Sequence, residues 1–138
     1  MKKIDTTCII DDDPIFVYGT KRVMKEVDFT EKIVVYNNGQ DAIDGLTETV
    51  NDGDNIPPVV FLDLNMPIMN GWEFLEEFNK LPEEAIAGVT IYIVSSSIDP
   101  RDLEKVKQFN VVNNYIVKPV TPKDLEAIMK TIKEHKAQ

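Results

Sequence analysis

The chain has 138 residues, a formal net charge of −9, 43% hydrophobic residues and 28% charged residues. This length and composition predict one globular domain whose hydrophobic core needs no disulfide or metal to hold it together. The acidity argues against a nucleic-acid-binding surface, which would require a basic patch. Solubility alone, or a partner protein with a basic face, would account for the negative charge.

Cysteine usage and the lengths of the apolar runs exclude further classes of protein. The single cysteine, Cys8, has no partner for an intramolecular disulfide, and its apolar neighbours indicate a small buried strand residue. No long apolar run follows the charged N-terminus, so a signal peptide is not indicated. No run is long enough to span a membrane. We therefore expect the protein in the cytoplasm.

Strand-like apolar runs and helical periodicities alternate five times along the chain. The predicted strands are residues 6–10, 32–36, 59–62, 89–94 and a segment within 111–117. The predicted helices cover residues 14–27, 40–50, 72–81 and 100–109, followed by a last helix from Pro122 with Thr121 as its cap. This alternation predicts an α/β domain: a doubly wound parallel sheet with helices on both faces and right-handed crossovers.

Polar residues stand at the end of four of these strands. Asp11 and Asp12 follow the first strand, and Asp63 follows a continuous apolar run that indicates a strand buried on both faces. Ser95 and Lys118 follow the fourth and fifth strands. Because the carboxyl ends of parallel strands share one edge of the sheet, we expect these side chains to meet in one crevice.

The chemistry of this set points to phosphoryl transfer. Crowded carboxylates stay ionised at neutral pH only if a cation lies among them, and an all-oxygen set suits Mg²⁺ better than Zn²⁺. An ammonium and a hydroxyl can bind phosphoryl oxygens while a carboxylate receives the group. Each feature alone has a plain structural interpretation as a cap, turn or strand end. Their ordered combination favours the functional one.

This ordered set resembles the receiver domains of two-component response regulators, the CheY-like family. The resemblance rests on residues 9–13, residues 63–67 with Gly71, residues 94–96 and residues 115–119, and it extends from about residue 6 to residue 132. It implies a flavodoxin-like sheet with strand order 2-1-3-4-5. It also implies a phosphoacceptor signalling module rather than an enzyme.

The resemblance implies a role for each acidic residue of the set. Asp63 corresponds to the phosphoacceptor. Asp12 corresponds to the direct Mg²⁺ ligand and Asp11 to the acid that helps to hold the water shell of the metal. The backbone carbonyl of Asn65 is expected on the metal as well. The neighbouring Asp13 has a plain structural role as the cap of the first helix.

The remaining matches concern the response to phosphorylation. Lys118 corresponds to the lysine that pairs with the phosphoryl group, and Ser95 to the switch hydroxyl that moves to bond it. Tyr115 corresponds to the aromatic switch that swings inward, and Pro119 to a cis-proline. Ser95 stands where threonine is more usual in the family, but it keeps the hydroxyl.

The implied phosphodonor is a sensor histidine kinase or a histidine phosphotransfer protein. A downstream protein would bind the face formed by the helix at 100–109, the strand within 111–117 and the last helix. We expect no nucleic-acid or membrane partner, and a monomer or weak dimer. Residues 1–138 are predicted to be one stand-alone receiver domain without an output domain, although a piece of a longer regulator would have the same sequence.

Two other functions remain as alternatives. An aspartate-nucleophile, Mg²⁺-dependent phosphohydrolase of the haloacid dehalogenase type would need a second aspartate two residues after the nucleophile, where this chain has Asn65. A receiver-like binding module that works without phosphorylation would not need the complete set of site residues. A further departure from the family is the stretch 46–58, which is longer than usual and is predicted to lie in a loop that tolerates insertions.

Overall fold

The computed structural model describes residues 3–97 and 99–136 of the chain. Its five strands form one parallel sheet in the order β2-β1-β3-β4-β5, which confirms the predicted topology. The strands are β1 (Ile4–Ile10), β2 (Thr30–Tyr36), β3 (Val59–Asp63), β4 (Thr90–Ser95) and β5 (Val112–Val117).

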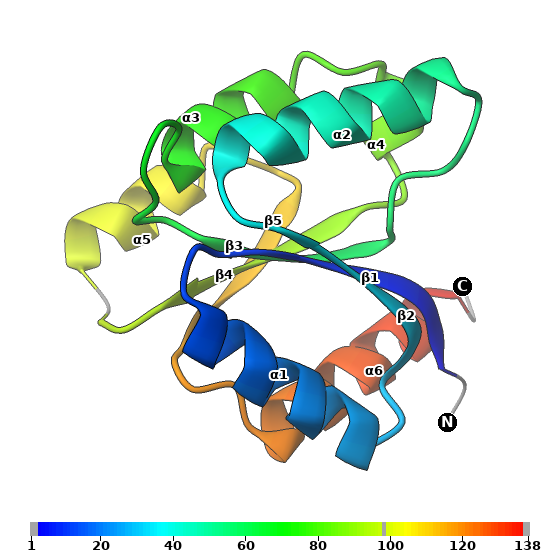
Figure 1. Cartoon of the computed structure of the whole chain (residues 1–138), viewed down its shortest axis with the longest axis vertical. Helices are drawn as coiled ribbons and strands as arrows, with labels where there is room; N and C mark the ends of the chain where they lie inside the picture. Colours follow the sequence, from blue (N-terminus) through cyan, green and yellow to red (C-terminus); the bar gives the residue numbers. More distant parts are fainter. Residues whose placement is uncertain (1–2, 98, 137–138) are drawn as a thin grey trace.

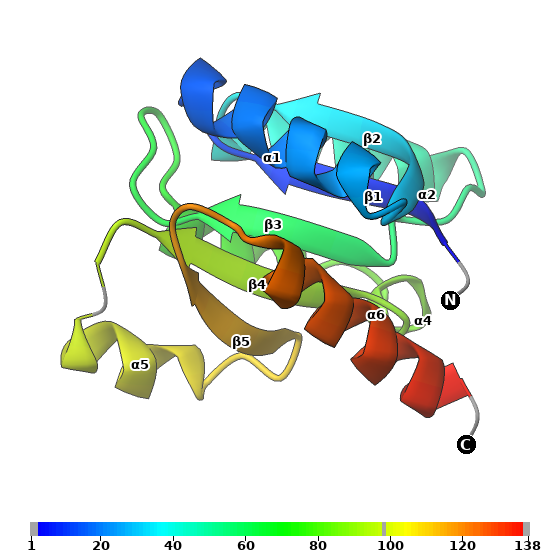
Figure 2. The same ribbon diagram turned by 90° about the horizontal axis from the view of Figure 1, so that it is seen from below.

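Helices cover both faces of the sheet, as expected for this alternation (Figure 1). They are α1 (Pro14–Glu26), α2 (Gly39–Asn51), α3 (Gly71–Phe78), α4 (Glu83–Ile86), α5 (Pro100–Val106) and α6 (Pro122–Lys136). Helices α1 and α6 pack on one face, while α2, α3 and α5 contribute to the core on the other face. In Figure 2, α1 and α6 lie in front of the sheet and run in nearly the same direction.

The central strand β3 is buried along its whole length, as its apolar run predicts. Phe61 packs toward α1 and α6, where its ring lies 6.1 Å from the ring of Phe29 and 5.8 Å from that of Tyr92. Leu62 points to the opposite core, which also contains Phe74 and other α3 side chains. Two separate cores therefore fix β3 and hold Asp63 at its carboxyl end.

Local sequence signals define where the helices next to this end begin. The Asp13 carboxylate accepts hydrogen bonds from the backbone N–H groups of Ile15 and Phe16, so Asp13 caps α1 as predicted. Asn70 and Glu73 form a reciprocal capping box at the start of α3. Both helices are thereby fixed next to the ends of β1 and β3.

Two connections are now defined. Residues 82–88, which lie between the predicted helix 72–81 and the predicted strand 89–94, contain the short helix α4. The predicted helix 40–50 is confirmed as α2, which ends at Asn51. The description of the whole stretch 46–58 as a loop was therefore wrong for its first residues, which belong to that helix, and the loop covers residues 52–58.

No helix among the described residues is long and apolar enough to cross a membrane.

Candidate functional site

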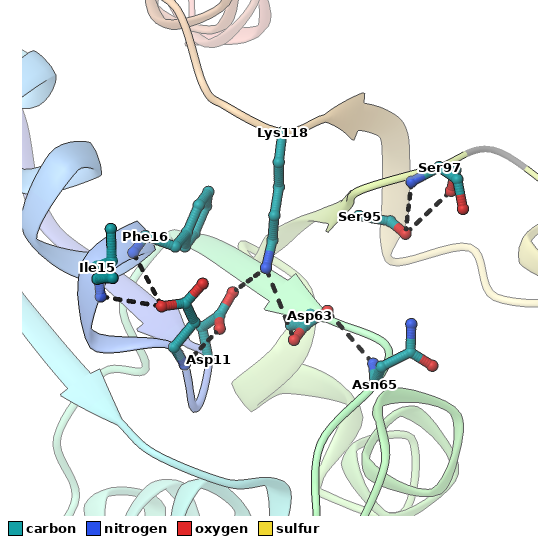
Figure 3. Close-up of polar contacts among 9 residues, drawn as sticks. Asp11, Ile15, Phe16, Asp63, Asn65, Ser95, Ser97 and Lys118 are labelled. Atoms are coloured by element: carbon teal, nitrogen blue, oxygen red, sulfur yellow. Dashed lines mark hydrogen bonds and ion pairs between the residues drawn. The ribbon is translucent and has the colours of Figure 1, made fainter.

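The carboxyl edge of the sheet brings the predicted residues together (Figure 3). Asp11 and Asp12 follow β1, and Asp63 is the last residue of β3. Ser95 ends β4, and Lys118 follows β5. The site residues therefore come from four parallel strands, as their positions in the sequence predicted.

Three carboxylates form the acidic centre of this edge. One oxygen each from Asp11, Asp12 and Asp63 lies within 4.8 Å of the others. Asp11 is fully buried and Asp63 is 5% exposed, whereas Asp12 is exposed. Burial, together with the negative charge of Asp11, raises the pKa of Asp63 to about 6, although Lys118 and the Asn65 N–H act in the opposite direction.

Lys118 supplies the positive charge of the site. Its Nζ lies 2.9 Å from Asp11 Oδ2 and 3.8 Å from Asp63 Oδ2. The ammonium also lies 4.3 Å from the centre of the Phe16 ring, which holds it by a cation–π contact. The contact with Asp11 is the shorter of the two carboxylate contacts. Lys118 thus bridges two carboxylates, and the peptide bond that joins it to Pro119 is cis.

The donor set fits a hard divalent cation. The buried Asp11 Oδ2 contacts the Lys118 ammonium but accepts no well-aligned hydrogen bond from the described residues, so it retains a lone pair. Two buried carboxylates beside an exposed third would offer oxygen ligands on one side and leave the solvent side to water. Mg²⁺ prefers such a partly hydrated, all-oxygen environment.

The loop after β3 closes tightly around Asp63. The Asn65 N–H donates to Asp63 Oδ1 at 3.3 Å, and the Gly71 N–H donates to the Leu64 carbonyl at 3.0 Å. A Cβ atom on Gly71 would lie 2.8 Å from the Asp63 carbonyl oxygen and from Leu64 Cα. Only glycine therefore permits this close approach of α3 to the end of β3.

Comparison with known proteins decides which family has this arrangement. The model of the response regulator receiver domain matches residues 7–130. The chain belongs to this family.

Individual relatives agree with the family match. A two-component response regulator from Cytophaga hutchinsonii has a similar structure, with a TM-score of 0.88 and 30% identity, covering 96% of this chain and 99% of that one. The probable methanogenesis regulatory protein FilR2 of Methanothrix harundinacea is 27% identical over 92% of this chain and 80% of its own length. The Vibrio cholerae chemotaxis protein CheY4 shares the fold, with a TM-score of 0.71 and 17% identity over 94% of this chain and 98% of that one.

In this receiver domain, Ser95 and Tyr115 meet at one acceptor. The Ser95 hydroxyl donates to the Ser97 carbonyl oxygen at 2.9 Å, and the Tyr115 hydroxyl donates to the same oxygen at 3.2 Å. Figure 3 shows Ser95 and Ser97 beside the cluster of Asp11, Asp63 and Lys118, without a contact to it. Two side chains from neighbouring strands therefore share a single backbone group.

Sequence reasoning missed two participants in this geometry. Phe16 lies within the predicted helix 14–27, and nothing in helical periodicity distinguishes a core residue from one that contacts a lysine. The Ser97 carbonyl was missed because a backbone acceptor has no sequence signal.

Proposed function

We propose that this receiver domain accepts a phosphoryl group on Asp63 in a two-component or phosphorelay pathway, and that it needs Mg²⁺ to do so. The observation that carries the proposal is the cluster of three carboxylates within 4.8 Å of one another, with the Lys118 ammonium 3.8 Å from Asp63. No purely structural role requires two buried carboxylates at this point, because the repulsion between them destabilises the fold.

Asp63 and Lys118 have different roles in the phosphoryl transfer. An Asp63 carboxylate oxygen attacks phosphorus, the P–N bond of a phosphohistidine donor breaks, and the imidazole leaves with the bonding electron pair. Lys118 is close enough to Asp63 to pair with an oxygen of the incoming group. The product is an aspartyl phosphate, which water hydrolyses slowly.

Asp11, Asp12 and the backbone carbonyl of Asn65 would hold the metal next to Asp63. When bound, Mg²⁺ neutralises charge on the phosphoryl oxygens and on the carboxylates. Asp11 keeps Lys118 in place through its 2.9 Å contact, so the ammonium is already positioned before the group arrives.

The shared Ser97 carbonyl supports a switch that starts at Ser95. If the Ser95 hydroxyl turns to bond a phosphoryl oxygen, it must release the Ser97 carbonyl, which Tyr115 then holds alone. Tyr115 lies on β5 and the Ser97 segment leads to α5. Phosphorylation would therefore change the surface formed by α5, β5 and α6, which we propose as the binding face for a downstream protein.

The phosphodonor would be a sensor histidine kinase or a phosphotransfer protein. Exposed apolar side chains lie on both segments next to the acidic cluster: Ile15 in the first turn of α1 is 82% exposed, and Ile68 in the loop before α3 is 78% exposed. A phosphohistidine can reach Asp63 only if its protein covers this edge, and such a complex would bury both residues. We further propose that the domain is cytoplasmic and that it is a monomer or weak dimer.

Intact mass spectrometry after incubation with acetyl phosphate tests this function. We expect one phosphoryl adduct per chain, only with Mg²⁺ present, lost in hydroxylamine and absent in Asp63→Asn. Rapid release of many phosphate molecules per chain would instead indicate a phosphohydrolase. No adduct either from acetyl phosphate or from a phosphorylated histidine phosphotransfer protein would indicate a module that works without phosphorylation.

A further inference from the structure

No well-aligned hydrogen bond joins the Lys118 ammonium to either of the carboxylates beside it. Asp63 Oδ2 lies 3.8 Å from Nζ, which is beyond hydrogen-bond distance. Asp11 Oδ2 lies 2.9 Å from Nζ, but it has no hydrogen-bond partner among the described residues. Both carboxylates attract the ammonium, but Coulomb attraction depends on distance and sets no direction. A further contact is therefore needed to decide where the ammonium rests between them.

The ring of Phe16 provides such a contact. The ammonium lies over this ring, 4.3 Å from its centre, where the electrons of an aromatic face attract a cation. Phe16 is 9% exposed and the Lys118 side chain 16% exposed, so little water competes with the ring. In the view of Figure 3, the ring and Asp11 lie to the left of the ammonium and Asp63 to its right. The ring therefore favours the position of the ammonium beside Asp11.

One short segment of the chain places both the ring and the Asp11 carboxylate. Asp11 Oδ1 accepts a hydrogen bond from the Asp13 N–H at 2.9 Å, and Asp13 Oδ1 accepts one from the Phe16 N–H at 3.3 Å. The cap that begins α1 thereby fixes the backbone of Phe16 relative to Asp11. The Phe16 side chain also belongs to the core that α1 and α6 form on the sheet. The ring is thus held in place independently of Lys118.

The position of the ammonium matters for the reaction of Asp63. A hydrogen bond from Lys118 would engage a lone pair of the carboxylate that has to attack phosphorus. At 3.8 Å, Lys118 makes no such bond with Asp63 Oδ2. The ammonium nevertheless stays close enough to contact an oxygen of a phosphoryl group that arrives at Asp63. An ammonium held beside Asp11 therefore suits both the attack and the binding of the transferred group.

We propose that Phe16 is a positioning residue for the phosphoryl transfer, because its ring holds the Lys118 ammonium beside Asp11 and away from a direct hydrogen bond with Asp63. This inference rests on the proposed function, since it concerns the rate at which Asp63 accepts the group. Phe16 acts through Lys118 and touches neither the phosphodonor nor the phosphoryl group. Weakening the attraction between ring and ammonium, with the shape of the ring preserved, should therefore slow phosphorylation.

Fluorinated phenylalanines at position 16 separate the electrostatic effect of the ring from its packing. One, three or five fluorine atoms change the size of the ring little but withdraw electrons from its face step by step. We expect the rate of adduct formation with acetyl phosphate and Mg²⁺, measured by intact mass, to fall with each step, by roughly three- to tenfold over the series. A rate that does not depend on fluorination at position 16 would overturn the proposal.

Phe29 is the matched control for this series. It is fully buried on the same face of the sheet, and its ring packs against Phe61. No cation lies over the Phe29 ring among the residues that the structure describes. The same fluorinated residues at position 29 should leave the phosphorylation rate unchanged. An equal decline at positions 16 and 29 would show an effect of packing and would overturn the positioning role.

NMR of the lysine side chains tests the contact itself, without a phosphodonor. The ring current of Phe16 should shift the ε-methylene protons of Lys118 upfield of those of Lys80, which is exposed and pairs with Glu77. In Phe16→Leu, which keeps an apolar side chain but removes the ring, this upfield shift should disappear. Signals of Lys118 and Lys80 at the same position in the wild type would overturn the proposal.

Failure of the positioning role and failure of the proposed function can be told apart. A wild type that forms the Mg²⁺-dependent adduct, with no decline along the fluorinated series at position 16, would disprove the role of Phe16 alone. A wild type that forms no adduct with any phosphodonor would disprove the phosphoacceptor function, and the role of Phe16 in the transfer with it.

Discussion

At the scale of single residues, the buried carboxylates of the site repel each other and thereby lower the stability of the fold. Asp63 has a pKa of about 6 in the folded protein, well above the usual value for an aspartate, because it is buried beside Asp11. A raised carboxyl pKa means that the folded state binds the proton more tightly than the unfolded state. Without Mg²⁺, the protein should therefore lose stability as the pH rises from about 4 to above 6.

Asp63→Asn tests directly how much the buried Asp63 charge destabilises the protein. We expect the variant to be about 1–2 kcal/mol more stable than the wild type at pH 8 without Mg²⁺, because it removes a buried charge from the cluster. The difference should shrink at pH 5, where wild-type Asp63 is protonated in the folded state. Urea denaturation of both proteins at the two pH values measures it. A variant that is less stable at pH 8 would show that the Lys118 contact outweighs the repulsion.

Lys118→Ala should have the opposite effect. Its ammonium contacts Asp11 and Asp63 and is 16% exposed, so its removal leaves two buried carboxylates without a cation. We expect a loss of about 2–4 kcal/mol in the free energy of unfolding at pH 8. The exposed Lys80, which pairs with Glu77 at the surface, provides the control, because Lys80→Ala should change stability by less than about 0.5 kcal/mol. Equal effects of the two substitutions on urea denaturation would contradict a stabilising role of Lys118 between the two buried carboxylates.

At the scale of elements, the close approach of α3 to β3 sets the shape of the site. Gly71→Ala would place a Cβ atom 2.8 Å from the Asp63 carbonyl oxygen, so the loop that carries Asn65 must shift. We expect a destabilisation of about 1–3 kcal/mol and slower phosphorylation by acetyl phosphate. Thermal unfolding and the intact-mass assay measure the two effects.

Gly19 offers a matched control for this substitution. It lies inside α1, and a Cβ atom there would meet nothing within 4 Å. Gly19→Ala should stabilise the protein by up to about 1 kcal/mol through helix propensity and leave phosphorylation unchanged. Gly71→Ala with wild-type stability and rate would show that the loop tolerates the shift.

At the scale of the whole molecule, phosphorylation should act on one side of the sheet more than on the other. Ser95 and Tyr115 share the Ser97 carbonyl next to α5 and β5, whereas no hydrogen bond from a described residue of α1 reaches that carbonyl. Hydrogen exchange with and without acetyl phosphate, both with Mg²⁺, should therefore change most in residues 99–117 and least in the second half of α1. Equal changes in both regions, or changes that persist in Asp63→Asn, would contradict the switch.

The fold was largely predictable because each element has a strong local signal. The buried run before Asp63, the cap at Asp13 and the apolar periodicities located the strands and long helices to within a few residues. The short helix α4 was not predictable, since four residues are too few to show a period. The helix 40–50 agrees with α2, so only the description of the first residues of 46–58 as loop was wrong.

The positions of the site residues were predictable from topology, but their pairings were not. That Asp11, Asp12, Asp63, Ser95 and Lys118 meet follows from the ends of parallel strands. The shorter contact of Lys118 with Asp11, its packing on Phe16 and the shared Ser97 carbonyl depend on side-chain rotamers and backbone acceptors, which no spacing encodes. The bulge at Asn113 was missed for a similar reason, because a register shift leaves no clear mark in the sequence.

Mapping the phosphoryl group to a residue tests the central claim most directly. The chain would be phosphorylated with acetyl phosphate and Mg²⁺, reduced with borohydride to convert an aspartyl phosphate into homoserine, and digested for tandem mass spectrometry. The account predicts homoserine at position 63 only, and none without Mg²⁺. Homoserine at position 11 or 12, or an unreduced phosphate ester on Ser95, would contradict the assignment of Asp63 as the phosphoacceptor.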